Sequence, residues 1–222
     1  MSLYFFLHDA DFFLGQVCPA LAECWRQRRF TPCGPLAAAL RPAVAAFTER
    51  FHTGAGESVL ALVESRLPFD RDTWRLLVGE ILLYGAREIP EIQTAPETLT
   101  CLLAPEESPQ GEEVRSRVAP IQQAHFGTRD LVFGGGYYRP EHAGWNDLRD
   151  VARLADFLAA VDPDSWGIQD LLPLREIKDD EERADELEFA REWFPELVNL
   201  YRQAREQKQI VVSEVVQSAG LD

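Results

Sequence analysis

Apolar residues recur along most of the chain at intervals of three and four positions, which predicts a largely helical protein. The predicted helices cover 11–29, 34–51, 56–67, 70–85, some of 112–127, 145–161 and 181–207. The last of these carries the most regular stripe, formed by Leu187, Ala190, Phe194, Leu197, Tyr201 and Ala204. Because that stripe continues through Pro195, we expect a single kinked helix rather than two separate ones.

Three short apolar runs predict strands, at 2–7, 130–135 and 210–216. Helices together with a few strands indicate an α+β fold, in which a mostly helical single domain over 1–222 packs on a small mixed sheet. A length of 222 residues suits one domain. The candidate boundary is the segment 104–113, "APEESPQGEE".

The charge of the chain limits its partners. It has 22 basic and 37 acidic residues and a formal net charge of −15. Such a surface repels nucleic acids and anionic membranes, whereas a basic protein partner is compatible with it. No apolar run approaches the roughly 18 residues that span a bilayer, and no signal peptide is recognisable. We therefore expect a cytoplasmic protein with no nucleic-acid or membrane partner.

The four cysteines are Cys18, Cys24, Cys33 and Cys101, and they lack the C-x-x-C spacing of a structural zinc site. Reduced thiols are the expectation for a cytoplasmic chain. The acidic run "DDEERADE" at 179–186 lies at the start of the last predicted helix, where negative charge complements the helix dipole.

The stretch "DLVFGGGYYRPEHAGW" at 130–145 contains three consecutive glycines. Their spacing fits neither a dinucleotide fingerprint nor a P-loop, so a turn that leads from a strand into the helix of 145–161 is the better interpretation. The nearby aromatic side chains could line a ligand groove. The candidate groove residues are Tyr137, Tyr138, His142 and Trp145.

The stretch "FFLHDADFF" near the N-terminus is an apolar strand that ends in Asp-x-Asp. It resembles the first motif of the haloacid dehalogenase-like phosphatases. That resemblance implies Asp9 as nucleophile and Asp11 as acid/base, with Mg²⁺ between them. The other interpretation is a strand end whose Asp11 caps the following helix.

The layout of 70–216 resembles the YfbM-like family of uncharacterised bacterial proteins. The segments that carry the resemblance are "DRDTWRLLVGEILLYG", "FGGGYYRPEH", "VARLADFLAAVDPDSW" and "ELVNLYRQAREQKQIVVSEVV". The N-terminal helical segment, residues 1–67, matches poorly and is expected to be divergent. The resemblance implies a small α+β cytosolic domain of no established activity.

The leading hypothesis is a cytosolic binding or interaction protein without a catalytic set, whose partner is a protein or a small molecule and which needs no cofactor. The alternative is a magnesium-dependent phosphoester hydrolase that uses Asp9 and Asp11.

We expect the protein not to bind DNA, because its net charge is −15 and its basic cluster, "RQRR" at 26–29, is short. Gel shifts at low salt with duplex and single-stranded DNA should show no retarded band. Salt-sensitive binding in the micromolar range would contradict this expectation.

Overall fold

The computed structural model describes residues 2–51, 58–63, 68–104, 119–138, 142–174 and 176–216. The strands are β1 (Ser2–Asp9), β2 (Arg129–Asp130), β3 (Val132–Phe133), β4 (Gly136–Tyr137), β5 (His142–Asn146) and β6 (Gln209–Val216). The α-helices are α1 (Ala10–Phe12), α2 (Cys18–Gln27), α3 (Gly34–Phe51), α4 (Val59–Leu62), α5 (Arg71–Gly85), α6 (Pro96–Leu103), α7 (Pro120–Phe126), α8 (Leu148–Ala159) and α9 (Asp180–Glu206). Shorter helical turns are the π-helical η1 (Phe13–Val17) and the 3-10 turns η2 (Thr31–Cys33), η5 (Pro163–Ser165) and η6 (Ile168–Leu171).

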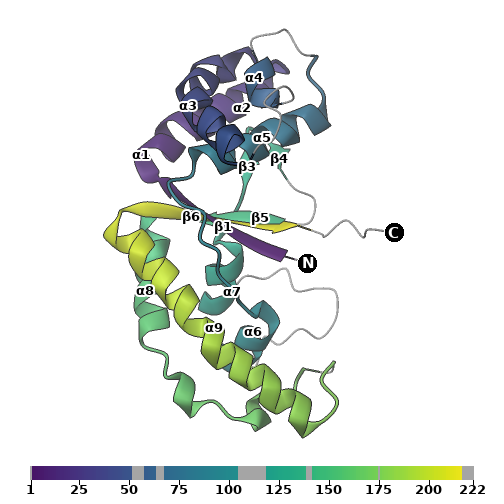
Figure 1. Ribbon diagram of the computed structural model, residues 1–222, viewed down its shortest axis with the longest axis vertical. Coiled ribbons are helices and arrows are strands. Elements are labelled where there is room, and N and C mark those ends of the chain that lie inside the picture. The colour runs from purple at the N-terminus through teal and green to yellow at the C-terminus, as the bar shows by residue number, and fades with distance from the viewer. Residues whose placement is uncertain are drawn as a thin grey trace.

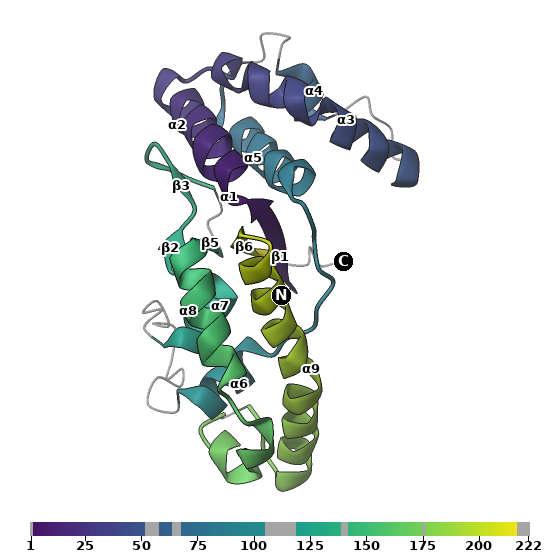
Figure 2. The same cartoon turned by 90° about the vertical axis from the view of Figure 1, so that its left-hand side faces the viewer.

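The centre of the molecule is a four-stranded sheet with the strand order β1-β6-β5-β2 (Figure 1). Every strand pair described is antiparallel, so the α+β class is confirmed, while the sheet is antiparallel rather than mixed. Helices α1 to α5 lie on one side of the sheet and α6 to α9 on the other. The connection from α5 to α6 runs past the outer edge of β1 (Figure 2), where the backbones of Leu7 and Glu88 form an isolated bridge.

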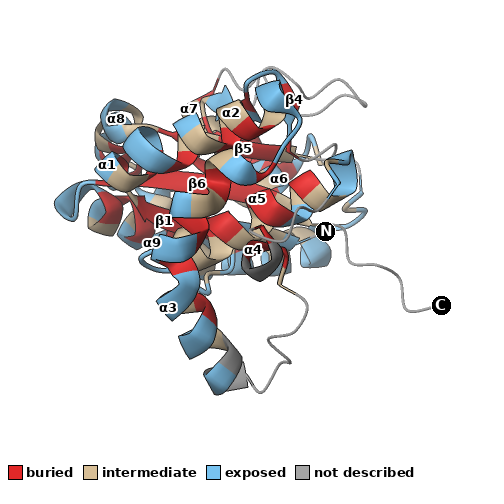
Figure 3. Ribbon diagram, turned by 90° about the horizontal axis from the view of Figure 1, so that it is seen from above, coloured by how far each residue is buried: buried red, intermediate tan, exposed pale blue. Residues whose placement is uncertain are grey.

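The strands of the sheet are largely buried, as their red colour in Figure 3 shows. The two faces of the sheet belong to two separate hydrophobic cores. Successive residues of a strand point to opposite faces. Phe6, Ile210 and Val212 therefore enter the core under α2 to α5. Phe5, Leu7 and Val211 enter the core with α8 and α9. This explains why both long strands are apolar along most of their length instead of alternating with polar residues.

The most regular sequence patterns are confirmed. Helix α9 runs without interruption from Asp180 to Glu206 and contains Pro195, as its stripe indicates. Strands β1 and β6 begin and end within two residues of the runs that predict them. Helix α5 is capped by Asp70, whose side chain accepts a hydrogen bond from the Thr73 N–H at 2.8 Å.

The segment 11–29 is divided rather than a single α-helix. It consists of α1, the π-helical turn η1 and α2. Pro19 lies in the first turn of α2 and has no N–H to donate to the carbonyl four residues earlier. The Cys18 N–H instead bonds to the Phe13 carbonyl, and a π-type turn accommodates the proline.

The glycine run forms a β-hairpin, which corrects the prediction of a strand leading directly into a helix. Gly134 and Gly135 are the turn residues, with φ of 57° and 92°. Both angles are positive, as in the tight turns that join two antiparallel strands. The hairpin β3–β4 packs so closely on α2 that a Cβ atom at Gly136 would lie only 2.5 Å from the Trp25 ring. Glycine is therefore needed both for the turn angles and for close packing.

Two further predictions change at this point of the chain. The expected strand 130–135 is divided between the main sheet, through β2, and the separate β3–β4 hairpin. The expected helix 145–161 begins only at Leu148, because Trp145 and Asn146 belong to β5. Asp147 caps the helix by accepting hydrogen bonds from the N–H groups of the second and third helical residues.

Other predictions are tested over only some of their length. Helix α3 is helical throughout and contains Pro42. Within 56–67 the structure shows α4, and within 112–127 it shows α7. Most of the remaining residues of these two segments (56–57, 64–67 and 112–118), and nearly all of the candidate boundary 104–113, lie outside the described residues.

Replacement of Phe194 by Ala should lower the free energy of unfolding by about 3–5 kcal/mol, the usual cost of deleting a buried Phe side chain. Phe194 is only 2% exposed, and its ring lies edge-on to Trp166 with 5.2 Å between centroids. Phe189→Ala in the same helix is the matched control, because Phe189 is 44% exposed. It should cost less than about 1 kcal/mol in the same denaturant melt. Equal costs for the two variants would contradict the assignment of the buried face.

Candidate functional site

Asp9 and Asp11 lie where β1 ends and α1 begins. The Asp9 carboxylate accepts a hydrogen bond from the Phe12 N–H at 2.8 Å, so Asp9 rather than Asp11 caps the helix. Asp11 is exposed in the first turn of that helix. Within the described residues, no group of three or more His, Cys, Asp and Glu side chains is placed to hold a metal ion. The donor set that Mg²⁺ would need is thus not assembled around this pair.

The neighbouring His8 is fully buried, with its ring 5.1 Å from that of Phe13. Burial lowers the pKa of His8 to about 4, although the backbone of Gly85 acts in the opposite direction. The imidazole is therefore neutral at neutral pH. Because protonation is easier in the unfolded chain, His8 makes folding less favourable as the pH falls from about 6.5 toward 4. Its sealed position suits packing rather than proton transfer with a substrate.

The four predicted groove residues do not face one space. Tyr137 is exposed at the tip of the β3–β4 hairpin, whereas Tyr138 is buried. The Tyr138 hydroxyl donates toward the buried Glu214 carboxylate, 3.2 Å from each oxygen. In β5, Trp145 packs on the core under α2 to α5. On the opposite face of the sheet, His142 forms a hydrogen bond of 2.7 Å between its Nε2 and the Phe126 carbonyl.

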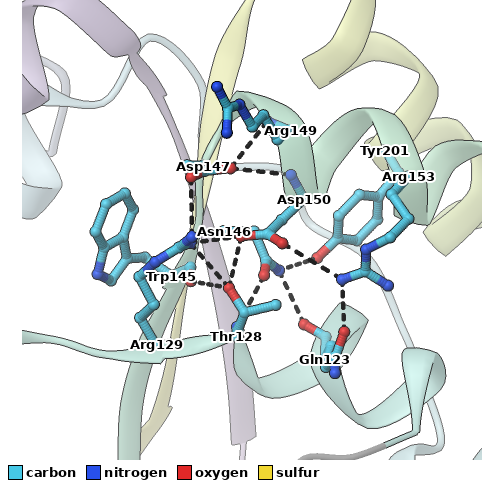
Figure 4. Close-up of polar contacts among 10 residues, drawn as sticks. All are labelled: Gln123, Thr128, Arg129, Trp145, Asn146, Asp147, Arg149, Asp150, Arg153 and Tyr201. Carbon is cyan, nitrogen blue, oxygen red and sulfur yellow. Dashed lines mark hydrogen bonds and ion pairs between the residues drawn. The ribbon is translucent and has the colours of Figure 1, made fainter.

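A polar cluster that the sequence patterns do not reveal lies where α7, β5, α8 and α9 meet (Figure 4). Its centre is the buried amide of Asn146, which is fully hydrogen-bonded. The Asn146 Oδ1 accepts from the Thr128 N–H at 2.8 Å. Its Nδ2 donates to the Gln123 carbonyl and to the Tyr201 hydroxyl, both at 2.8 Å. The Tyr201 hydroxyl in turn donates to the Ala124 carbonyl at 2.7 Å. One amide thereby ties three elements together.

The outer region of the same cluster is ionic. The guanidinium of Arg129 contacts Asp147 at 2.9 Å and Asp150 at 2.5 Å, and it lies over the Trp145 ring at 5.2 Å from the centroid. Burial alone would raise the pKa of Asp150, but hydrogen bonds from Thr128 and Arg129 outweigh it and hold the pKa below its usual value. Asp150 therefore stays ionised at neutral pH and stabilises the fold until the pH falls through that lowered pKa. Both carboxylates are engaged in holding β2 against α8, which is a structural role.

Helix α9 presents a different kind of surface on its outer side. Phe189 and Trp193 stack with ring centroids 5.1 Å apart and planes inclined by 14°. Phe189 is 44% exposed and Trp193 is half-buried. Acidic residues occupy neighbouring positions three, four or seven residues away on the same side of the helix. These acidic residues are Asp185, Glu186, Glu192 and Glu196. We call this set, together with the two aromatic residues, the acidic aromatic face.

Two hydrogen bonds show which side of α9 this is. Glu186 accepts from the Thr98 hydroxyl at 2.5 Å, and Glu196 accepts from the Gln93 N–H at 2.7 Å. The face thus borders α6 and the connection that precedes it. Residues 88–103 contain no Lys or Arg. Between Ala184 and Tyr201 the single basic residue is Arg191, which donates to the carbonyls of Pro163 and Trp166. Among the described residues of these two segments, no Lys or Arg side chain is therefore paired with the acidic aromatic face.

No protein-family model matches the chain, and no curated protein sequence matches it. Among solved structures, the fold is similar in part to that of YfbM from Escherichia coli, a protein of unknown function. The two share 16% sequence identity with a TM-score of 0.43 over 61% of this chain and 84% of that chain. The likeness is one of layout and assigns no activity. Among the described helices, none has the length and apolar composition needed to cross a bilayer.

Replacement of Asn146 by Ala should destabilise the fold by about 2–3 kcal/mol, because buried donors and acceptors at Thr128, Gln123 and Tyr201 would lose their shared partner. Asn199→Ala is the matched control, since Asn199 is an exposed amide on α9. That change should leave stability equal or slightly raised, because Ala favours helix. Urea melts of both variants measure the difference, and a small cost at Asn146 would show that the amide is dispensable.

Proposed function

We propose that this protein is a non-enzymatic binding protein that recognises a basic segment of a partner protein through the acidic aromatic face of α9. The observation that carries the proposal is the stacked Phe189–Trp193 pair at the surface, with Phe189 44% exposed and the exposed carboxylates of Asp185 and Glu192 beside it. Large aromatic side chains are normally buried, so an exposed stacked pair is a candidate contact surface.

The chemistry of the face selects for a cation. The face of an aromatic ring attracts Lys and Arg, most strongly for Trp. Nearby carboxylates add charge-assisted hydrogen bonds to the same groups. A net charge of −15 would also steer a basic partner toward the molecule before contact. An acidic ligand would be repelled by the carboxylates, and a neutral one would lack the cation–π and long-range electrostatic attraction.

Hydrolysis of phosphoesters at Asp9 and Asp11 has weaker support. The Asp9 carboxylate is hydrogen-bonded to the backbone of α1, and the described residues provide no further acidic ligand beside the pair. A nucleophilic carboxylate needs to be free to attack, so the capping interaction disfavours that chemistry.

Titration calorimetry with a short synthetic peptide of Lys, Arg and Leu residues tests the proposal at about 0.15 M ionic strength. The double variant Phe189→Ala/Trp193→Ala should raise Kd at least about tenfold, because it deletes the ring faces while leaving every charge in place. Leu76→Ala is the matched control: Leu76 is 61% exposed on α5, away from the face, and its loss should leave Kd unchanged.

A second pair of variants separates the local carboxylates from the overall charge. Asp185→Asn/Glu192→Gln should weaken binding more than Asp164→Asn/Glu206→Gln, which removes the same charge from exposed positions elsewhere. If the peptide binds the aromatic double variant as tightly as the unmodified protein, the attraction comes only from net charge and the proposal is wrong.

A further inference from the structure

Two cysteine thiols meet in the core beneath the helices on the α2 side of the sheet. Cys24 in α2 and Cys33 in η2 are both completely buried, and their Sγ atoms are 2.7 Å apart. Both are free thiols in this structure. The chain reverses direction between them through Arg28, whose φ is 51°.

The backbone of this turn already holds the two thiols together. The Arg29 N–H donates to the Cys24 carbonyl at 3.2 Å, and the Cys33 N–H donates to the Phe30 carbonyl at 2.9 Å. The Cys24 thiol also approaches the Phe30 carbonyl, at 3.6 Å. A disulfide needs its two sulfur atoms brought to a bond length of about 2.0 Å, and here packing and hydrogen bonds supply most of that approach.

We propose that Cys24 and Cys33 are a disulfide-forming pair, oxidised by a thiol–disulfide oxidant of the glutathione disulfide class. One thiol loses a proton and attacks a sulfur of the oxidant, which releases one oxidant thiol and leaves a mixed disulfide. The second cysteine then displaces the remaining oxidant thiol and closes the bond. Two protein thiols become one disulfide, and the oxidant accepts the two electrons and two protons as two thiols.

The surroundings of the other cysteines leave this pair as the one the fold selects. Cys101 belongs to the opposite core, where its thiol donates to the Asp170 carbonyl at 3.1 Å. Cys18 lies at the start of α2 and is half-buried. Two effects raise the pKa of the Cys33 thiol: the larger is its hydrogen bond with the Cys24 thiol, and the second is burial. Since exchange requires a thiolate, we infer that oxidation occurs while the segment is folding or locally open.

The disulfide would close the segment 24–33 and join the end of α2 to the turn that precedes α3. Closing a loop removes conformational freedom from the unfolded chain, so the oxidised protein should be more stable than the reduced one. The pair would then make the stability of the α2–α5 side depend on the redox state of the surroundings.

The experiment is to unfold the reduced protein, refold it with glutathione disulfide, block the remaining thiols and map the peptides by mass spectrometry. Trypsin cleaves after Arg26, Arg28 and Arg29, which lie between the two cysteines, so a disulfide appears as two linked peptides. Because the first peptide, 1–26, also contains Cys18, its fragmentation spectrum must show the blocking group on Cys18 and the link on Cys24. We expect the Cys24–Cys33 linkage to predominate and the linked mass to be about 2 Da below the sum of the reduced peptides. The oxidised protein should melt several degrees higher than the reduced one, and dithiothreitol should abolish the difference.

Cys18→Ser and Cys101→Ser should retain the linkage, whereas Cys33→Ser should lose it. If Cys33→Ser does not fold, the peptide map of the unmodified protein still decides the matter. A map in which all four thiols remain blockable after refolding, or in which Cys18 or Cys101 predominates in the linked peptides, would overturn the proposal.

Discussion

The antiparallel ladder between β1 and β6 is the constraint on which the rest of the molecule depends. It pairs the first described residues of the chain with the last, from Ser2 opposite Val216 to Asp9 opposite Gln209. Because both strands are apolar on both faces, each face needs its own cover of helices. The chain between them provides these covers in order, first α1 to α5 and then α6 to α9 (Figure 1). The two hydrophobic cores thus form because the β1–β6 pair has an apolar face on each side.

The edges of this sheet are protected by different means. Beside β1, the connection from α5 to α6 pairs with Leu7 and then reaches Pro90, which cannot donate a backbone hydrogen bond. At the other edge β2 is only two residues long, and both residues are exposed and charged. Short, charged edge strands resist pairing with other chains. The edges of the sheet therefore offer little for pairing with a strand of another chain.

Helix α9 combines a side that faces the core with the acidic aromatic face, which we propose as the recognition surface. Its inner side contributes the stripe through Phe194, Leu197 and Tyr201 to the second core. The outer side carries Phe189 and Trp193 among carboxylates. A helix packed this firmly along one side presents the other as a rigid surface, so partner binding would require little loss of conformational freedom. The acidic first turns also favour the helix itself through its dipole.

The sequence by itself determined the class of fold, the two long strands and the long helices α5, α8 and α9. Periodic burial leaves a local pattern of apolar residues, and this pattern can be recognised without knowing which surfaces the elements pack against.

The tertiary structure alone decided the features that rely on residues distant in the chain. The strand character of Trp145 and Asn146 comes from pairing with β6, and no local pattern shows it. The glycine hairpin depends on contact with Trp25, more than a hundred positions earlier. The Asn146 cluster and the Cys24–Cys33 contact likewise need the fold to bring side chains together. For the acidic aromatic face, the sequence shows only that aromatic and acidic residues recur at helical spacing. Whether their side chains are exposed depends on which parts of α9 the other elements cover.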